Sequence, residues 1–175
     1  MTRAAHLVSR FFGSLRPRAL DPETIAWVER TLEPGELRVW EGLGAADRAE
    51  SVAVARRLDA ADSTWTAAAL LHDAGKQASA YGPLGRAVVT VVAAGVGGEK
   101  VRSWTAGTGR VRARMGCYAA HDVIGAELLA AAGARPAVIA WAGAHHRPER
   151  WAVTGIPPEV CRALAAADGE PLSRP

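Results

Sequence analysis

Four of the five histidines in this 175-residue chain lie in apolar stretches with helical spacing: His72, His121, His145 and His146. Apolar residues recur three or four positions from each of them, so the imidazoles are expected to point inward. Asp73 follows the first histidine directly. Buried polar groups are costly unless something pairs with them. One such histidine is usually bonded to a carbonyl, but a shared divalent metal ion would pair with all of these groups at once.

The composition is typical of a globular chain with a single hydrophobic core, since 49% of the residues are hydrophobic and 22% are charged. The 21 basic and 18 acidic residues leave a net charge of only +3. This small excess suits an anionic small molecule and gives no argument for nucleic acid. Cys117 and Cys161 form no metal-binding or secretory pattern, so a cytoplasmic protein is expected. No apolar run is long enough for a transmembrane segment.

Helix signals dominate the chain, and no pair of strands is evident. We predict a compact, single-domain, all-α helical bundle. Residues 1–44 are expected to form a helical extension packed on a core built from residues 45–175. Gly- and Arg-rich residues 105–116 are expected to form a loop. Four of the expected helices start at Pro22, Pro34, Asp47 and Pro83, and another starts after Ser63 as its N-cap. Three more are expected over residues 119–132, 136–146 and 157–168.

The N-terminal segment, residues 3–18, combines four arginines with an apolar stripe. Such a segment most often packs its apolar stripe on its own domain. It could instead be a basic amphipathic helix that docks on a membrane or an acidic partner.

Four short strings occur in an order that points to a family. The first is ALLHDAGK at residues 69–76, and it is followed by HDVIGAELL at 121–129, AHHRP at 144–148 and AAD at 166–168. Over residues 45–170 the chain resembles the HD superfamily of metal-dependent phosphohydrolases. The histidine pair before the final aspartate is similar to the binuclear branches of that superfamily. An all-α domain of the HD type is therefore expected.

The resemblance implies two metal positions that share the Asp73 carboxylate. His72 and Asp168 would complete the first position. The second would be completed by His121, His145 and His146. One or two divalent ions (iron, manganese or magnesium) are the implied cofactor, and a metal-activated hydroxide would attack phosphorus.

Two residues near these ligands are candidates for contacting the substrate. Lys76 stands where the superfamily has a lysine that neutralises phosphoryl charge, so it is a candidate catalytic residue with Asp73; a solvated lysine at a helix end is the alternative. Arg147 is the second candidate. No Gly-Tyr-Pro sequence follows His146, so specificity for a cyclic dinucleotide is not supported.

One position departs from the superfamily pattern. Glu50 stands where a histidine usually precedes the HD helix. A glutamate is a competent oxygen ligand for manganese, magnesium or iron. Alternatively, Glu50 pairs with Arg48 or Arg57, and that side of the site is weakened.

These observations predict a phosphohydrolase that cleaves a phosphate ester or anhydride of a small phosphorylated substrate, most simply a nucleotide. The alternative is a catalytically degenerate HD domain that binds a nucleotide or metal as a regulatory module. The oligomeric state is left open.

Overall fold

The structure is a computed structural model that describes residues 19–58, 62–79, 81, 83–106 and 109–169. All regular elements within these ranges are helices, so the predicted all-α fold is confirmed. The hypotheses about residues 3–18 lie outside the described residues. The α-helices are α2 (Pro22–Thr31), α3 (Pro34–Glu41), α4 (Ala45–Arg57), α5 (Ser63–Leu71), α6 (Pro83–Val96), α7 (Gly98–Arg102), α8 (Arg110–Ala119), α9 (His121–Ala131), α10 (Pro136–Ala144) and α11 (Pro158–Asp168). Three 3-10 helices join them: η1 (Ala74–Ser79), η2 (Ser103–Ala106) and η3 (Pro148–Val153).

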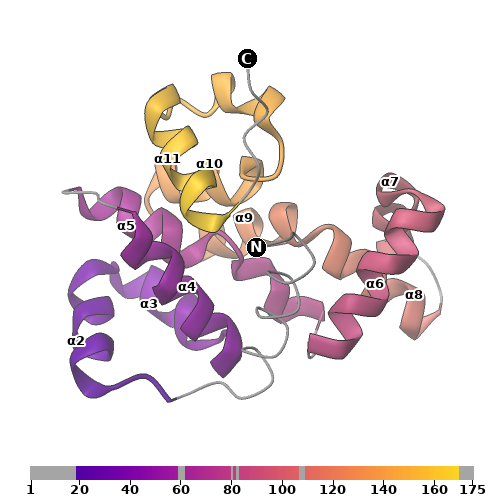
Figure 1. Ribbon diagram of the computed structural model, residues 1–175, viewed down its shortest axis with the longest axis horizontal. Coiled ribbons are helices and arrows are strands. Elements are labelled where there is room, and N and C mark those ends of the chain that lie inside the picture. The colour runs from indigo at the N-terminus through magenta and orange to yellow at the C-terminus, as the bar shows by residue number, and fades with distance from the viewer. Residues whose placement is uncertain (1–18, 59–61, 80, 82, 107–108, 170–175) are drawn as a thin grey trace, which may run out of the picture.

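Helix α5 lies at the centre of the bundle, between α2–α4 on one side and α9–α11 on the other (Figure 1). Its sequence, STWTAAALL, is apolar on most of its circumference, and a helix of that kind is stable only when it is surrounded. One continuous core therefore forms around it. The largest fully buried apolar side chains of this core are Val28, Val54, Leu70, Leu71, Leu129, Val138, Trp141 and Leu164.

Several helices begin at residues with capping side chains. Asp21 accepts a hydrogen bond from the backbone N–H of Thr24 at 2.8 Å and starts α2, as expected. The predicted Ser63 cap of α5 is off by one residue, because the Asp62 side chain accepts from the Thr64 N–H at 2.7 Å. In both cases a carboxylate satisfies an N–H group that the helix itself leaves unpaired.

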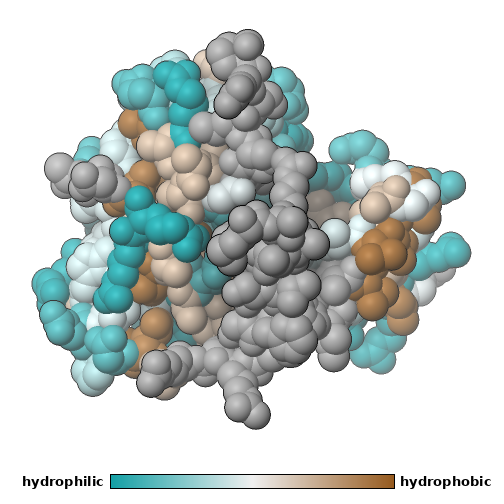
Figure 2. Space-filling view, in the orientation of Figure 1, coloured by the Kyte–Doolittle hydropathy of each residue, from teal (hydrophilic) through white to brown (hydrophobic). Residues whose placement is uncertain are grey.

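Helices α6, α7 and α8 form a lobe that projects from the rest of the bundle (Figure 1). The predicted loop over residues 105–116 is wrong, because α8 begins at Arg110. Gly116 signalled a loop, but it lies inside α8, where an added Cβ would come within 2.3 Å of the backbone nitrogen of Thr105. This glycine therefore permits close packing of α8 on η2. Figure 2 shows hydrophobic surface on this lobe, where Val88 and Val91 are exposed.

A buried ion pair fastens α3 to the start of α10. The Glu36 side chain is fully buried, and its Oε2 accepts from Arg135 Nη2 at 2.6 Å. Its Oε1 accepts from the Arg135 backbone N–H at 3.0 Å and from Nε at 2.9 Å. The same carboxylate closes a capping box with the Glu33 N–H at 3.0 Å. Both oxygens are thus fully used.

None of the described helices combines the length and the apolar character that a membrane crossing requires.

Candidate metal centre

The HD pair lies at the turn between α5 and η1. Helix α5 ends at Leu71, and His72 and Asp73 form the turn before η1 begins at Ala74. Gly75 in η1 packs directly on the start of α9, since a Cβ added there would come within 1.9 Å of the His121 carbonyl oxygen. Only a glycine permits this approach. The close contact brings the first two histidines of the set into one site.

Three imidazoles of the site are oriented by the same local bond. The Nδ1 atoms of His72 and His121 lie 2.8 Å from the carbonyl oxygens of Ala69 and Tyr118, three residues earlier. His145 makes the same contact with Ala142 at 2.9 Å. Since a carbonyl only accepts, each Nδ1 must carry the proton. In the neutral imidazole, Nε2 then keeps a lone pair, the state in which a histidine binds a metal ion.

The Nε2 atoms converge on the Asp73 carboxylate. Oδ1 of Asp73 lies 3.2 Å from His121 Nε2 and 3.8 Å from His145 Nε2. His146 approaches from the exposed side, with its Nε2 3.1 Å from that of His121. Together, Asp73 and these three histidines offer ligand atoms that all lie within 4.8 Å of one another. This four-residue group is called the three-histidine side of the centre.

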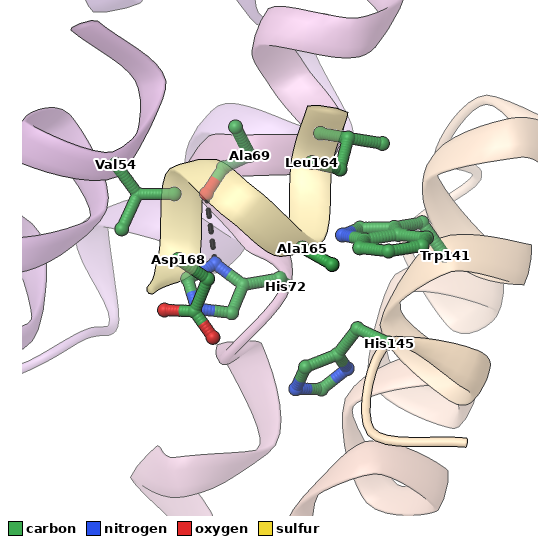
Figure 3. Close-up of a pocket in the computed structure, with 8 residues that line it drawn as sticks. All are labelled: Val54, Ala69, His72, Trp141, His145, Leu164, Ala165 and Asp168. Atoms are coloured by element: carbon green, nitrogen blue, oxygen red, sulfur yellow. Dashed lines mark hydrogen bonds and ion pairs between the residues drawn. The ribbon is translucent and has the colours of Figure 1, made fainter. Parts of the chain in front are cut away.

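The other carboxylate oxygen of Asp73 faces a different set of groups. Oδ2 lies 3.2 Å from His72 Nε2, which in turn lies 3.4 Å from Oδ1 of Asp168 at the end of α11. Lys76 Nζ also donates to Oδ2. Figure 3 shows the His72 ring beside the Asp168 carboxylate, with His145 facing them across a small pocket. This set is called the Asp168 side of the centre.

Several polar atoms of the centre are buried without a hydrogen-bond partner. Among the described residues, three atoms form no hydrogen bond of acceptable geometry: His72 Nε2, Asp73 Oδ1 and His145 Nε2. The distances between imidazole Nε2 atoms and Asp73 oxygens in this group are 3.2–3.8 Å. Leaving a buried polar atom unsatisfied costs about 1–3 kcal/mol. Two of these atoms, Asp73 Oδ1 and His145 Nε2, offer lone pairs, and a cation would satisfy both. The donor set therefore fits a divalent metal ion.

The electrostatics of the site also favour positive charge. Burial lowers the pKa of His72, but Asp73 and Asp168 outweigh it and raise that pKa to about 10. Burial raises the pKa of Asp168, while the neighbouring His72 imidazolium lowers it to about 2. The pKa of Asp73 is held well below its ordinary value, because Lys76 and His72 outweigh the effect of burial. Two carboxylates thus stay ionised at neutral pH in a largely buried site.

His145 differs from His72 in its electrostatic surroundings. Burial lowers the pKa of His145 to about 4, and the neighbouring imidazoles of His146 and His72 add to this effect. His145 is therefore neutral at physiological pH. A neutral imidazole with its lone pair on Nε2 is ready to act as a ligand without losing a proton.

The remaining sequence-predicted residues lie around this centre. Glu50 on α4 is ion-paired with Arg57 at 3.6 Å, one of the alternatives weighed for it, and it is not one of the four residues on the three-histidine side. Lys76 binds Asp73, so it lies in the centre. Arg147 follows the histidine pair and donates to Asp122.

The sequence reasoning missed one residue of this neighbourhood. That residue is Arg102, which contacts Asp122 in the first turn of α9. Arg102 comes from α7 and donates to Asp122 at 2.6 Å. No local pattern signals this contact, because twenty residues separate the pair.

Comparison with known proteins supports the resemblance. No curated protein and no solved structure matches the chain. The sequence does match the HD domain family over residues 37–171, which is most of the chain. HD domains make up a superfamily consisting mostly of metal-dependent phosphohydrolases, and they bind divalent metals. With its all-α fold and its Asp/His group, this chain belongs to the HD domain family.

Proposed function

We propose that this protein is a metal-dependent phosphohydrolase that cleaves a phosphate ester or anhydride of a small substrate, most simply a nucleotide. One observation carries the proposal: three imidazoles whose Nδ1 atoms are held by backbone carbonyls turn their Nε2 atoms toward the Asp73 carboxylate. A site of this kind is costly without a cation. A bound divalent ion would supply an acidic water and would neutralise phosphoryl charge.

We assign the tighter ion to the three-histidine side. Asp73 Oδ1 and the Nε2 atoms of His121, His145 and His146 would hold it, and an imidazole-rich set favours iron or manganese over magnesium. A second ion would lie on the Asp168 side, between His72 and Asp168, with Asp73 as the bridge. Glu50 is the remaining candidate ligand there, and it would have to leave its ion pair with Arg57. That requirement makes this side the weaker one.

Lys76 is the proposed catalytic partner of Asp73. Its ammonium group lies on Asp73 Oδ2 and its side chain is one-fifth exposed. A partly exposed ammonium group on this carboxylate is in a position to meet an arriving phosphoryl group. When a phosphoryl group arrives, a lysine in this position neutralises charge that develops on oxygen, while Asp73 stays ionised. Arg147 is the proposed second contact for the substrate.

Asp73→Asn tests this function, since it removes the shared charge and keeps the shape of the side chain. Turnover of phosphate esters and nucleotides by manganese- or iron-loaded protein should fall below detection in this variant. Glu36→Gln is the matched control, because it neutralises another buried carboxylate away from the centre; assayed below its melting temperature, it should keep wild-type turnover. Retained turnover in Asp73→Asn would overturn the proposal.

The runner-up function is a catalytically degenerate regulatory module. The Glu50–Arg57 ion pair and the ammonium of Lys76 on Asp73 favour it, because both place positive side chains against carboxylates that a second ion would need. This module would be stabilised by a nucleotide or metal and would release no product. A turnover assay run beside thermal unfolding in the same sample separates the two functions.

A further inference from the structure

A second charged cluster lies directly beside the metal centre. Asp122 accepts from Arg102 Nη1 at 2.6 Å through one oxygen and from Arg147 Nη2 through the other. Asp122 follows His121 and Arg147 follows His146, and the Nε2 atoms of those two histidines lie 3.1 Å apart. The cluster is therefore one residue away from the centre on both of the segments that build it. Arg102, Asp122 and Arg147 are called the arginine clamp below.

The arginine clamp carries more positive than negative charge. The Asp122 carboxylate accepts from both guanidinium groups, one at each oxygen. One carboxylate charge thus faces two guanidinium charges. Arg102 also lies 3.7 Å from Glu99, whose side chain is 94% exposed, and such a pair is largely screened by water. The surplus charge is left beside a centre that is proposed to bind phosphate.

Both arginine side chains are partly exposed, unlike the carboxylate that they share. The Asp122 side chain is 1% exposed, whereas those of Arg102 and Arg147 are each 27% exposed. A guanidinium has five N–H donors, and the bonds to Asp122 use only a part of them. Among the described residues, the buried Nε of Arg147 has no acceptor either. Arg102 ties α7 to α9 and Arg147 ties the segment after α10 to α9, and the donors left over on both arginines can take a further acceptor.

We propose that Arg102 and Arg147, aligned by Asp122, bind a second phosphoryl group of the substrate while the first one lies at the metal centre. Arginine suits this role, since its planar fork matches phosphate oxygens. The inference rests on the proposed function. Of the proposed substrates it favours phosphoanhydrides, which carry two adjacent phosphoryl groups, and not phosphate monoesters. Asp122 is a positioning residue, because it touches the arginines rather than the substrate.

Binding of two non-hydrolysable probes tests the clamp without any turnover. Methylenediphosphonate carries two phosphoryl groups and methylphosphonate carries one. Calorimetric titration of manganese-loaded protein, freed of unbound metal, should show a clear preference for the diphosphonate in the wild type. Arg102→Gln and Arg147→Gln should each weaken diphosphonate binding about tenfold, the loss of one charged hydrogen bond, and leave methylphosphonate binding unchanged. Arg38→Gln, an exposed arginine on α3, is the control and should keep the preference.

The outcomes separate this inference from the function on which it rests. Both arginine variants could keep the wild-type preference for the diphosphonate while Asp73→Asn still loses methylphosphonate binding. That result would contradict the role of the arginine clamp and would still support the metal centre. Equal binding of both probes by the wild type would also contradict the role of the clamp. Loss of both probes in the arginine variants, with unfolding unchanged, would make these residues part of the first phosphate site and contradict a separate second one.

Discussion

Two largely buried carboxylates in this molecule, Glu36 and Asp73, differ in how their oxygens are hydrogen-bonded. Glu36 is fully buried, and each of its oxygens accepts two hydrogen bonds, three from Arg135 and one from Glu33. The Asp73 side chain is 14% exposed, and its Oδ1 faces imidazole nitrogens without a hydrogen bond among the described residues. The first carboxylate is saturated by the chain itself. The second has one oxygen bonded to Lys76, while its other oxygen is left without a hydrogen bond among the described residues.

This difference separates a structural charge from a functional one. A buried ion pair with every oxygen satisfied holds two segments together and leaves nothing for a ligand. A largely buried carboxylate with an unsatisfied oxygen is costly to the protein alone and is stabilised when a cation arrives. Substitutions at the two sites should therefore affect different properties. Loss of Glu36 should lower stability, and loss of Asp73 should remove metal binding.

The largest expected change in stability comes from Glu36→Gln. It leaves Arg135 without its ionic partner, and breaking a buried pair destabilises by about 3–5 kcal/mol. Because the Arg135 side chain is one-fifth exposed, we expect the lower end, about 3 kcal/mol. Urea unfolding of the metal-free protein measures it.

Glu29→Gln is the matched control on exposed surface and should change stability by less than about 0.5 kcal/mol. A loss of metal binding in Glu36→Gln would contradict the separation of the two carboxylates.

Metal removal should have the next largest effect. At a metal concentration one hundred times its dissociation constant, binding stabilises the folded protein by about 2.7 kcal/mol. For a chain of this size, each kcal/mol shifts the melting temperature by roughly 2–4 °C. Chelation should therefore lower the melting temperature of the wild type by several degrees, as measured by calorimetry.

The same chelation should leave the melting temperature of Asp73→Asn unchanged. It should lower that of Glu36→Gln by as much as that of the wild type, because the effects of distant sites on stability are additive. A chelator effect on Asp73→Asn equal to that on the wild type would place the metal elsewhere.

The fold class and the candidate metal ligands could be predicted from the sequence because both depend on short local patterns. The His72-Asp73 turn, the His145-His146 pair and the final Asp168 are readable as motifs, and helical spacing places them on inward faces. Helix α8 was not predicted, because glycines such as Gly116 are typical of loops, whereas Gly116 permits close packing inside this helix. The Glu36–Arg135 pair spans 99 residues, so no pattern along the chain announces it.

A smaller effect is expected from Gly75→Ala. The added methyl group would meet the His121 carbonyl and the Gly125 backbone nitrogen, so η1 and α9 must move apart. Overpacking of this kind costs about 1–3 kcal/mol. Because His121 moves with α9, metal affinity should fall as well, as measured by calorimetric titration with manganese.

Gly95→Ala is the control, since nothing lies within 4 Å of an added Cβ in helix α6. It should stabilise the protein by up to about 1 kcal/mol. Unchanged metal affinity in Gly75→Ala would show that the close contact does not position His121.

The smallest expected effect is the acid dependence of the Glu36 contribution. Burial raises the pKa of Glu36, but the bonds from Arg135 and Glu33 outweigh it and lower that pKa below its ordinary value of 4.5. A carboxyl with a lowered folded-state pKa stabilises fully above its ordinary value, and this contribution is lost as the pH falls through the lowered one.

The stability difference between wild type and Glu36→Gln should therefore stay constant from neutral pH to about 5 and narrow below 4.5. Both chains keep Asp73, so its titration cancels. Urea unfolding across this range measures the difference, and a gap that widened toward acid would contradict the assignment.

The central claim is that Asp73 and its histidines hold a divalent metal, and elemental analysis tests it most directly. Wild-type protein and Asp73→Asn would be purified without chelator or histidine tag, and metal would be counted per chain. We predict one or two ions of iron or manganese in the wild type and almost none in the variant. A wild type that holds no metal, and gains no thermal stability from added manganese or ferrous iron, would contradict the account.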